Sequence, residues 1–120
     1  MTLIGDKAYL TILVKEPAGE KEFNAIIDTG AYKTMIPESE CESLGLEKIE
    51  EREVLGICPV PTTVSIYRAD VFCLGRRTVG SLIGFNIPSR EAVSLVGRDI
   101  LRKFNLDLNY KQNKVMIADP

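Results

Sequence analysis

The sequence contains no histidine in its 120 residues. This absence excludes the Ser-His-Asp and Cys-His arrangements of the common nucleophilic hydrolases, because both use an imidazole as the base. It also removes the histidine ligands that hold most catalytic zinc ions. If the chain is an enzyme, its acid–base groups must be Asp, Glu, Lys, Tyr or Cys. The sequence therefore favours carboxylate chemistry, and we expect no metal and no other cofactor.

Long apolar runs and basic runs are also missing. The apolar stretches are short, as at Val115–Ala118, and none approaches the roughly 18 residues that a membrane-spanning helix needs. The formal net charge is -2, and no Lys/Arg-rich stripe suggests nucleic-acid binding. The first residues, Met1 to Asp6, lack the basic start of a secretory signal. We therefore expect a soluble, cytoplasmic protein with neither nucleic acid nor membrane as a partner.

Cysteine is scarce, with three residues at Cys41, Cys58 and Cys73. The odd number and the lack of a Cys-x-x-Cys spacing argue against a disulfide framework. Free cysteines of this kind usually behave as small hydrophobic residues, and we expect that here.

The residues that are present indicate a mostly-β, barrel-like domain over residues 1–120. Short segments rich in β-branched and aromatic residues alternate with Gly- and Pro-containing turns, which is typical of such domains. Two short helices are predicted, at Pro37–Leu44 and Gly97–Phe104. Strands are predicted at Ala8–Val14, Glu22–Ile27, Val79–Phe85, Ala92–Val96, Leu106–Tyr110 and Lys114–Ala118, together with a long hairpin over Arg52–Leu74.

One short motif carries candidate chemistry. Asp28-Thr29-Gly30-Ala31 follows the apolar segment Ala25–Ile27 directly. By itself Asp-Thr-Gly is weak evidence, because Asp and Gly are common turn residues and short motifs match by chance. Two later features strengthen it. The Arg52–Leu74 hairpin carries Gly56 near its tip, and Leu95–Leu101 places an apolar pair, then Gly and Arg at the start of the second predicted helix.

These motifs in this order resemble the retropepsin family, the single-lobe aspartic proteases that include the retroviral proteases. The resemblance extends over nearly the whole chain. It implies a closed acid-protease barrel with a flap hairpin, a homodimer with one catalytic aspartate per subunit, and an extended peptide or protein as substrate.

The resemblance also implies roles for individual residues. Asp28 would be the catalytic residue, and Arg98 would support its loop. Many retroviral members carry an acid just after the Ala, where this chain has Tyr32, so the partner of Arg98 is left open. The remaining candidates are the loop residues Thr29, Gly30 and Ala31, the flap residues Leu55, Gly56, Ile57 and Cys58, and the substrate-pocket residues Tyr32, Val60 and Ile83.

The chemistry needs two carboxylates, one to activate water and one to protonate the scissile carbonyl. When two carboxylates lie side by side, they share one proton, because the repulsion between like charges keeps both from ionising easily. The chain has one Asp-Thr-Gly, and Asp99 is not followed by a second. A two-fold homodimer would supply the second Asp28, and the hairpin over Leu106–Ala118 is a candidate for its interface. Two alternatives stay open: a non-cleaving peptide-binding or scaffold module of the same fold, and an unrelated β-domain in which Asp-Thr-Gly is a turn.

Overall fold

The computed structural model describes residues 7–16, 19–54, 62–86 and 93–118. Strands make up most of this part of the chain, and the mostly-β prediction is confirmed. Among these residues, no helix combines the length and the apolar character that crossing a bilayer requires. The elements in chain order are β1 (Tyr9–Glu16), β2 (Gly19–Ile27), β3 (Met35–Pro37), α1 (Glu38–Ser43), β4 (Glu47–Val54), β5 (Thr62–Cys73), β6 (Arg76–Phe85), β7 (Leu95–Val96), α2 (Arg98–Leu101), β8 (Asn105–Asn109) and β9 (Lys114–Ala118).

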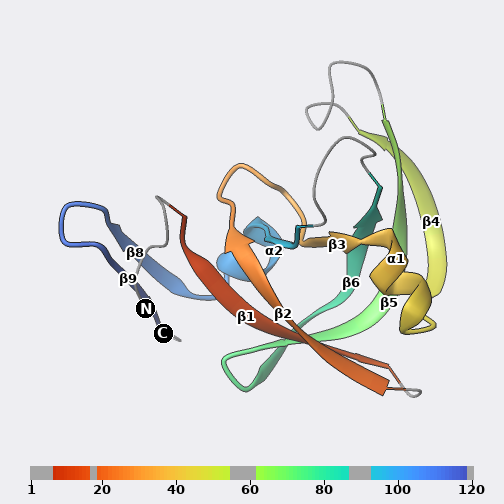
Figure 1. Cartoon of the computed structure of the whole chain (residues 1–120), viewed down its shortest axis with the longest axis horizontal. Coiled ribbons are helices and arrows are strands. Elements are labelled where there is room, and N and C mark those ends of the chain that lie inside the picture. The colour runs from red at the N-terminus through yellow and green to blue at the C-terminus, as the bar shows by residue number, and fades with distance from the viewer. Residues whose placement is uncertain (1–6, 17–18, 55–61, 87–92, 119–120) are drawn as a thin grey trace.

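The main sheet closes on itself. Its strand order is β1-β2-β7-β3-β6-β5-β4, and β1 also pairs with β5, which completes a ring and leaves β4 on its outside. Most neighbours are antiparallel, but β2 pairs with β7 and β3 pairs with β6 in parallel. Figure 1 shows this ring, with α2 near the middle of the molecule; α1 packs against β3 and β6. The predicted closed β fold is therefore present, as a ring of strands rather than a regular barrel.

The interior of the ring is filled by the alternating apolar residues of its strands. Leu10, Ile12 and Val14 of β1 are buried, while the residues between them are more exposed. Burying each such aliphatic side chain contributes about 1.5–3 kcal/mol. A second, smaller cluster packs Ala31, Met35, Val64, Ile66, Ile83 and Phe85 together.

Both predicted helices form, and both are shorter than predicted. α1 begins after Pro37, which is extended (φ -58, ψ 139) and serves as the N-cap residue. The chain leaves α1 through Gly45 at φ +68, a left-handed conformation that glycine adopts without strain. α2 ends at Leu101, because the amides of Lys103 and Phe104 bond to carbonyls only three residues back, which is the tighter 3₁₀ pattern.

The strands differ from prediction mainly on the outside of the ring. β4 begins at Glu47, five residues before the predicted start of its hairpin at Arg52. Its sequence is almost entirely charged, so alternation could not reveal it; the ladder to β5 fixes it as a charged edge strand. In contrast to β4, β7 is shorter than predicted and contains only Leu95–Val96. The predicted strand began at Ala92, which lies outside the described residues.

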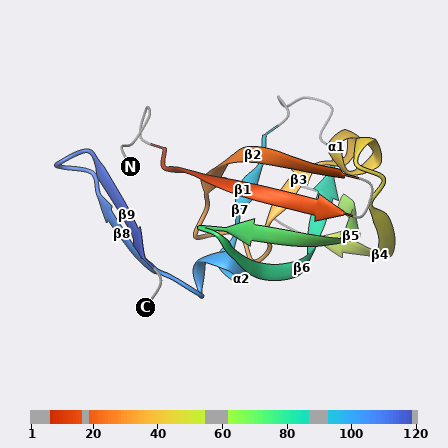
Figure 2. The ribbon, with the colours of Figure 1, turned by 90° about the horizontal axis from the view of Figure 1, so that it is seen from below.

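The last two strands form a sheet of their own. β8 pairs with β9 as predicted, and the main ring contributes no strand to this sheet. Figures 1 and 2 show the pair projecting to one side of the ring. Val115 is buried against Ala8, Ile27 and Leu106 and joins the sheet to the body, whereas Met116 on the opposite face is 65% exposed.

Candidate active site

The Asp28 loop leaves the ring at the end of a parallel strand pair. β2 runs beside β7 through Ile26↔Leu95 and Ile27↔Val96. The Asp28 amide continues the ladder by donating to the Val96 carbonyl at 3.0 Å. The backbone of Asp28 is therefore fixed by the sheet, and the residues after it turn away from the ladder.

The Asp28 carboxylate is oriented by its own loop. Its Oδ1 accepts a hydrogen bond from the Gly30 amide at 2.9 Å, and the Ala31 amide donates to the Asp28 carbonyl at 3.2 Å. Asp28 is half-buried, while Thr29 and Gly30 are exposed. A Cβ at residue 30 would lie 3.3 Å from Oδ1. The absence of a side chain there keeps one side of the carboxylate open.

The second half of the loop rests on the segment that follows β7. The Arg98 amide donates to the Ala31 carbonyl at 2.8 Å. Gly97 lies so close to Lys33 that a Cβ at residue 97 would sit 2.6–2.9 Å from the Lys33 backbone atoms. Arg98 thus contacts the loop through its backbone, and its side chain is exposed. In the described part of the chain, no carboxylate pairs with its guanidinium.

The polar anchor of the loop is a pair that sequence reasoning missed. Asp99 Oδ1 accepts hydrogen bonds from the Thr34 amide at 3.0 Å, the Thr34 hydroxyl at 2.8 Å and the Ile100 amide at 2.9 Å. The Thr34 hydroxyl in turn accepts from the Gly97 amide at 3.2 Å, and Thr34 is fully buried. Asp99 and Thr34 are 65 positions apart, so no local pattern links them.

The predicted pocket residues lie in different surroundings. Tyr32 is 41% exposed on the loop. Ile83 is fully buried in the second cluster, in contact with residues of the ring rather than with solvent. Val60 and the predicted flap residues Leu55, Gly56, Ile57 and Cys58 lie outside the described residues. The two arms of their hairpin, β4 and β5, are described and paired.

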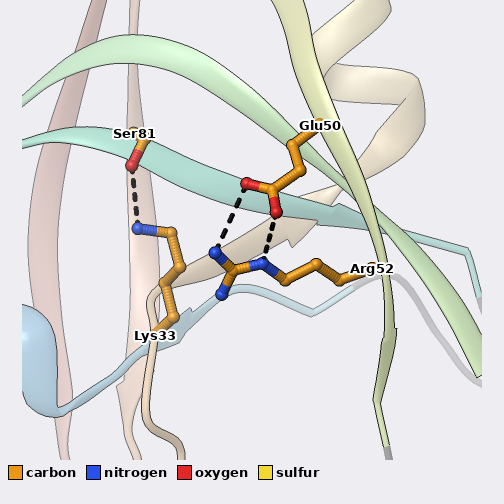
Figure 3. A network of polar contacts seen from close by, with 4 residues as sticks. All are labelled: Lys33, Glu50, Arg52 and Ser81. Carbon is orange, nitrogen blue, oxygen red and sulfur yellow. Dashed lines mark hydrogen bonds and ion pairs between the residues drawn. The ribbon is translucent and has the colours of Figure 1, made fainter.

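A cluster of charged and polar side chains borders the loop, and the sequence had not singled it out. Lys33 Nζ donates to Ser81 Oγ of β6 at 2.8 Å. Nearby on β4, Arg52 Nε bonds Glu50 Oε1 at 2.7 Å. Figure 3 shows these four side chains. Burial lowers the pKa of Lys33 from its ordinary value, opposed by Asp99 and assisted by Arg52.

The two described cysteines are not part of this site. Burial raises the pKa of Cys41 to about 12, with Glu38 adding to the effect. Burial alone raises the pKa of Cys73 to about 11. Both are free, buried thiols, which is consistent with the small-hydrophobe role expected for them. Cys58 lies outside the described residues.

Comparison with known proteins agrees with this geometry. The structure is similar to a retropepsin-like aspartic protease from Rickettsia conorii, with a TM-score of 0.71, 15% identity, and coverage of 99% of this chain and 87% of that one. It is also similar to EIAV protease in complex with the inhibitor HBY-793, with a TM-score of 0.59, 20% identity, and coverage of 82% and 88%. At these identities the likeness concerns the fold. No curated protein sequence matches the chain.

The family model of the retroviral aspartyl proteases matches residues 7–109. That range runs from the start of the described chain to the end of β8, and it includes the Asp28 loop, both arms of the hairpin and α2. The chain therefore belongs to the retroviral aspartyl protease family.

Proposed function

We propose that the protein is an aspartic endopeptidase that is active as a homodimer, with Asp28 as its catalytic residue. The observation that carries the proposal is the Asp28 carboxylate itself. It lies at the end of a parallel strand pair, is oriented by the Gly30 amide, and is flanked by exposed residues of the loop. This is an arrangement in which a second, identical loop can approach face to face.

The mechanism follows from pairing two such loops. The two Asp28 carboxylates share one proton and titrate as a unit. The ionised one takes a proton from a water between them, the water attacks the scissile carbonyl, and the protonated one donates to the carbonyl oxygen. Thr29 would brace the facing loop, and Gly30 would let the substrate backbone approach.

The β8–β9 sheet is the proposed dimer interface. An isolated two-stranded sheet is at best marginally stable in water. Within the described ranges, β8 and β9 form a separate two-stranded sheet. Met116, which is 65% exposed and the most exposed large hydrophobic residue among those that the structure describes, lies on this sheet. Pairing with the same sheet of a second copy would complete it and bury that surface, as a two-fold interface requires.

Two further parts of the proposal concern access and location. The hairpin tip, with Leu55, Gly56, Ile57 and Cys58, would close over an extended peptide, and Tyr32 and Val60 would line its pocket. We place the protein in the cytoplasm, a reducing compartment that suits the free thiols of Cys41 and Cys73.

The test is the Asp28→Asn variant, assayed by mass spectrometry of a peptide mixture and by sedimentation. We expect cleavage to be lost while the dimer and the fold persist, because the amide keeps the shape but cannot take the proton. Asp70→Asn is the matched control, since Asp70 is exposed and pairs only with Arg77 among the described residues. Cleavage at the wild-type rate by Asp28→Asn contradicts the proposal. Peptide binding by a wild-type protein that never cleaves identifies the binding-module alternative instead.

A further inference from the structure

Lys33 is a half-buried cation at the far end of the Asp28 loop. Its ammonium is directed at the Ser81 hydroxyl of β6, as Figure 3 shows. Partial burial strips water from a charged group, which is costly unless an opposite charge replaces it. The hydroxyl partner is neutral, so the cost is only partly offset within the described chain.

No carboxylate of the described residues pairs with this ammonium. Glu50, the nearest acid on β4, is held by Arg52 through bonds of 2.7 Å and 3.4 Å. Asp99 favours the charged form of Lys33 through space, and the hydrogen bonds to its Oδ1 come from Thr34 and Ile100. Lys33, Glu50 and Arg52 together carry one excess positive charge, which Asp99 offsets through space without a direct contact to the ammonium.

Ser81 makes the ammonium part of a built donor pair. An ammonium has three N–H donors, and Ser81 uses one. Because the Ser81 oxygen accepts from Lys33, its own hydroxyl hydrogen is free to point elsewhere. An incoming carboxylate could thus receive one hydrogen bond from Lys33 and one from Ser81, and charge-assisted bonds of this type are the stronger kind.

The Lys33–Ser81 pair lies close to the place where a peptide substrate would bind. Lys33 is five residues after Asp28 on the same loop, and it is followed at once by the buried anchor Thr34. Tyr32, beside it, is one of the groups that raise the pKa of Arg52 on β4, which places the loop next to the first arm of the hairpin. A peptide bound between loop and hairpin would pass this charge.

We propose that Lys33 and Ser81 form a subsite that selects an acidic side chain of the peptide substrate. This inference deepens the proposed function and rests on it for the presence of a bound peptide. The bound Glu or Asp would supply the direct ion-pair partner that Lys33 does not have among the described residues. The preference for an acidic over a neutral or basic side chain would come from the positive charge of Lys33 and not from the chemistry at Asp28.

The experiment measures binding apart from cleavage. Capped, amidated octapeptides carry Glu at each position in turn, with Gln at the same position as the neutral counterpart. Their affinities for the Asp28→Asn protein are measured by fluorescence anisotropy, and their cleavage by the wild-type protein is measured in parallel. We expect one position at which Glu is preferred over Gln by about tenfold at low salt, with the preference shrinking as salt rises.

Three variants in the Asp28→Asn background decide whether Lys33 is responsible. Lys33→Met should abolish the preference, Lys33→Glu should reverse it in favour of Lys over Gln, and Ser81→Ala should reduce it. Lys48→Met is the matched control, because it removes an exposed charge from β4 and should leave the preference unchanged. Equal loss in Lys48→Met would show a general field effect and overturn the subsite.

Thermal unfolding separates a ligand site from a structural lysine. Lys33→Met should keep or raise the melting temperature, because it removes a charge that burial disfavours. A Glu preference that survives Lys33→Met, or that exists at no position, overturns the inference even if the protein cleaves neutral peptides. A Lys33-dependent preference in binding without any cleavage supports the inference and refutes the proteolytic function.

Discussion

Thr34→Val tests whether the Asp99 anchor holds the Asp28 loop. The substitution replaces a fully buried hydroxyl by a methyl group of the same shape. It removes the bond from Thr34 to Asp99 Oδ1 at 2.8 Å and the bond from the Gly97 amide at 3.2 Å. Backbone bonds of the loop are retained, so the change isolates one oxygen atom.

The magnitude follows from those two bonds. A hydrogen bond to a charged acceptor contributes about 1.5–3 kcal/mol, and leaving a buried amide unsatisfied costs about 1–3 kcal/mol. The added methyl group returns up to about 0.8 kcal/mol. We therefore expect the free energy of unfolding to fall by about 2–4 kcal/mol, a large part of the roughly 5–15 kcal/mol that holds a typical domain together.

The measurement is urea unfolding at a fixed protomer concentration, because association would add to apparent stability. Thr63→Val is the matched control: Thr63 is exposed on β5, and its substitution should change stability by less than about 0.5 kcal/mol. If Thr34→Val is as stable as the wild type, the Thr34–Asp99–Gly97 contacts do not anchor the loop, and the reasoning fails.

Two further predictions concern packing and thiol chemistry. Gly97→Ala should destabilise the protein by about 1–3 kcal/mol in the same assay, because its Cβ would overlap the Lys33 backbone. The control is Gly19→Ala, since no atom lies within 4 Å of a Cβ at residue 19. Equal losses of stability in the two variants would refute the steric argument. In a Cys58→Ser background, Cys41 and Cys73 should be unreactive toward a disulfide reagent at pH 8 and react only on unfolding. The reason is that their raised pKa values, about 12 and about 11, keep them protonated; rapid modification of the folded protein would contradict those values.

Local sequence patterns were sufficient to predict the strands in which apolar and polar residues alternate. They were also sufficient to relate the Asp28 loop to the retropepsin family. β1, β8 and β9 have strand-like sequences, and the Asp-Thr-Gly motif is contiguous. β4 was placed too late because six of its eight residues, all but Ile49 and Val54, are charged, and only the ladder to β5 makes it a strand. The apolar residues of the predicted helix to Phe104, which are Ile100, Leu101 and Phe104, are all buried, but tight 3₁₀ turns replace its second half.

The support of the site could not be predicted in the same way. Arg98 was expected to support the Asp28 loop, and its partner was left open. Its amide, which any residue would supply, contacts the loop, and the side-chain hydrogen bond that anchors the loop comes from the neighbouring Asp99. Lys33 and Ser81 come from the loop and from β6, 48 positions apart. Their proposed role depends on the partial burial of the Lys33 side chain, which the amino-acid composition does not reveal.

The loop places its two proposed functions on one rigid segment. Its first residue, Asp28, is fixed by the sheet through Val96, and Thr34 at its other end is fixed through Asp99 and Gly97. Lys33 precedes that second anchor directly, so its backbone is fixed relative to that of Asp28, and its ammonium is held by the hydrogen bond to Ser81. Catalytic geometry depends on such fixed distances. An acidic side chain bound at Lys33 would therefore set which peptide bond lies over the aspartates, and recognition of charge would determine the position of the cut.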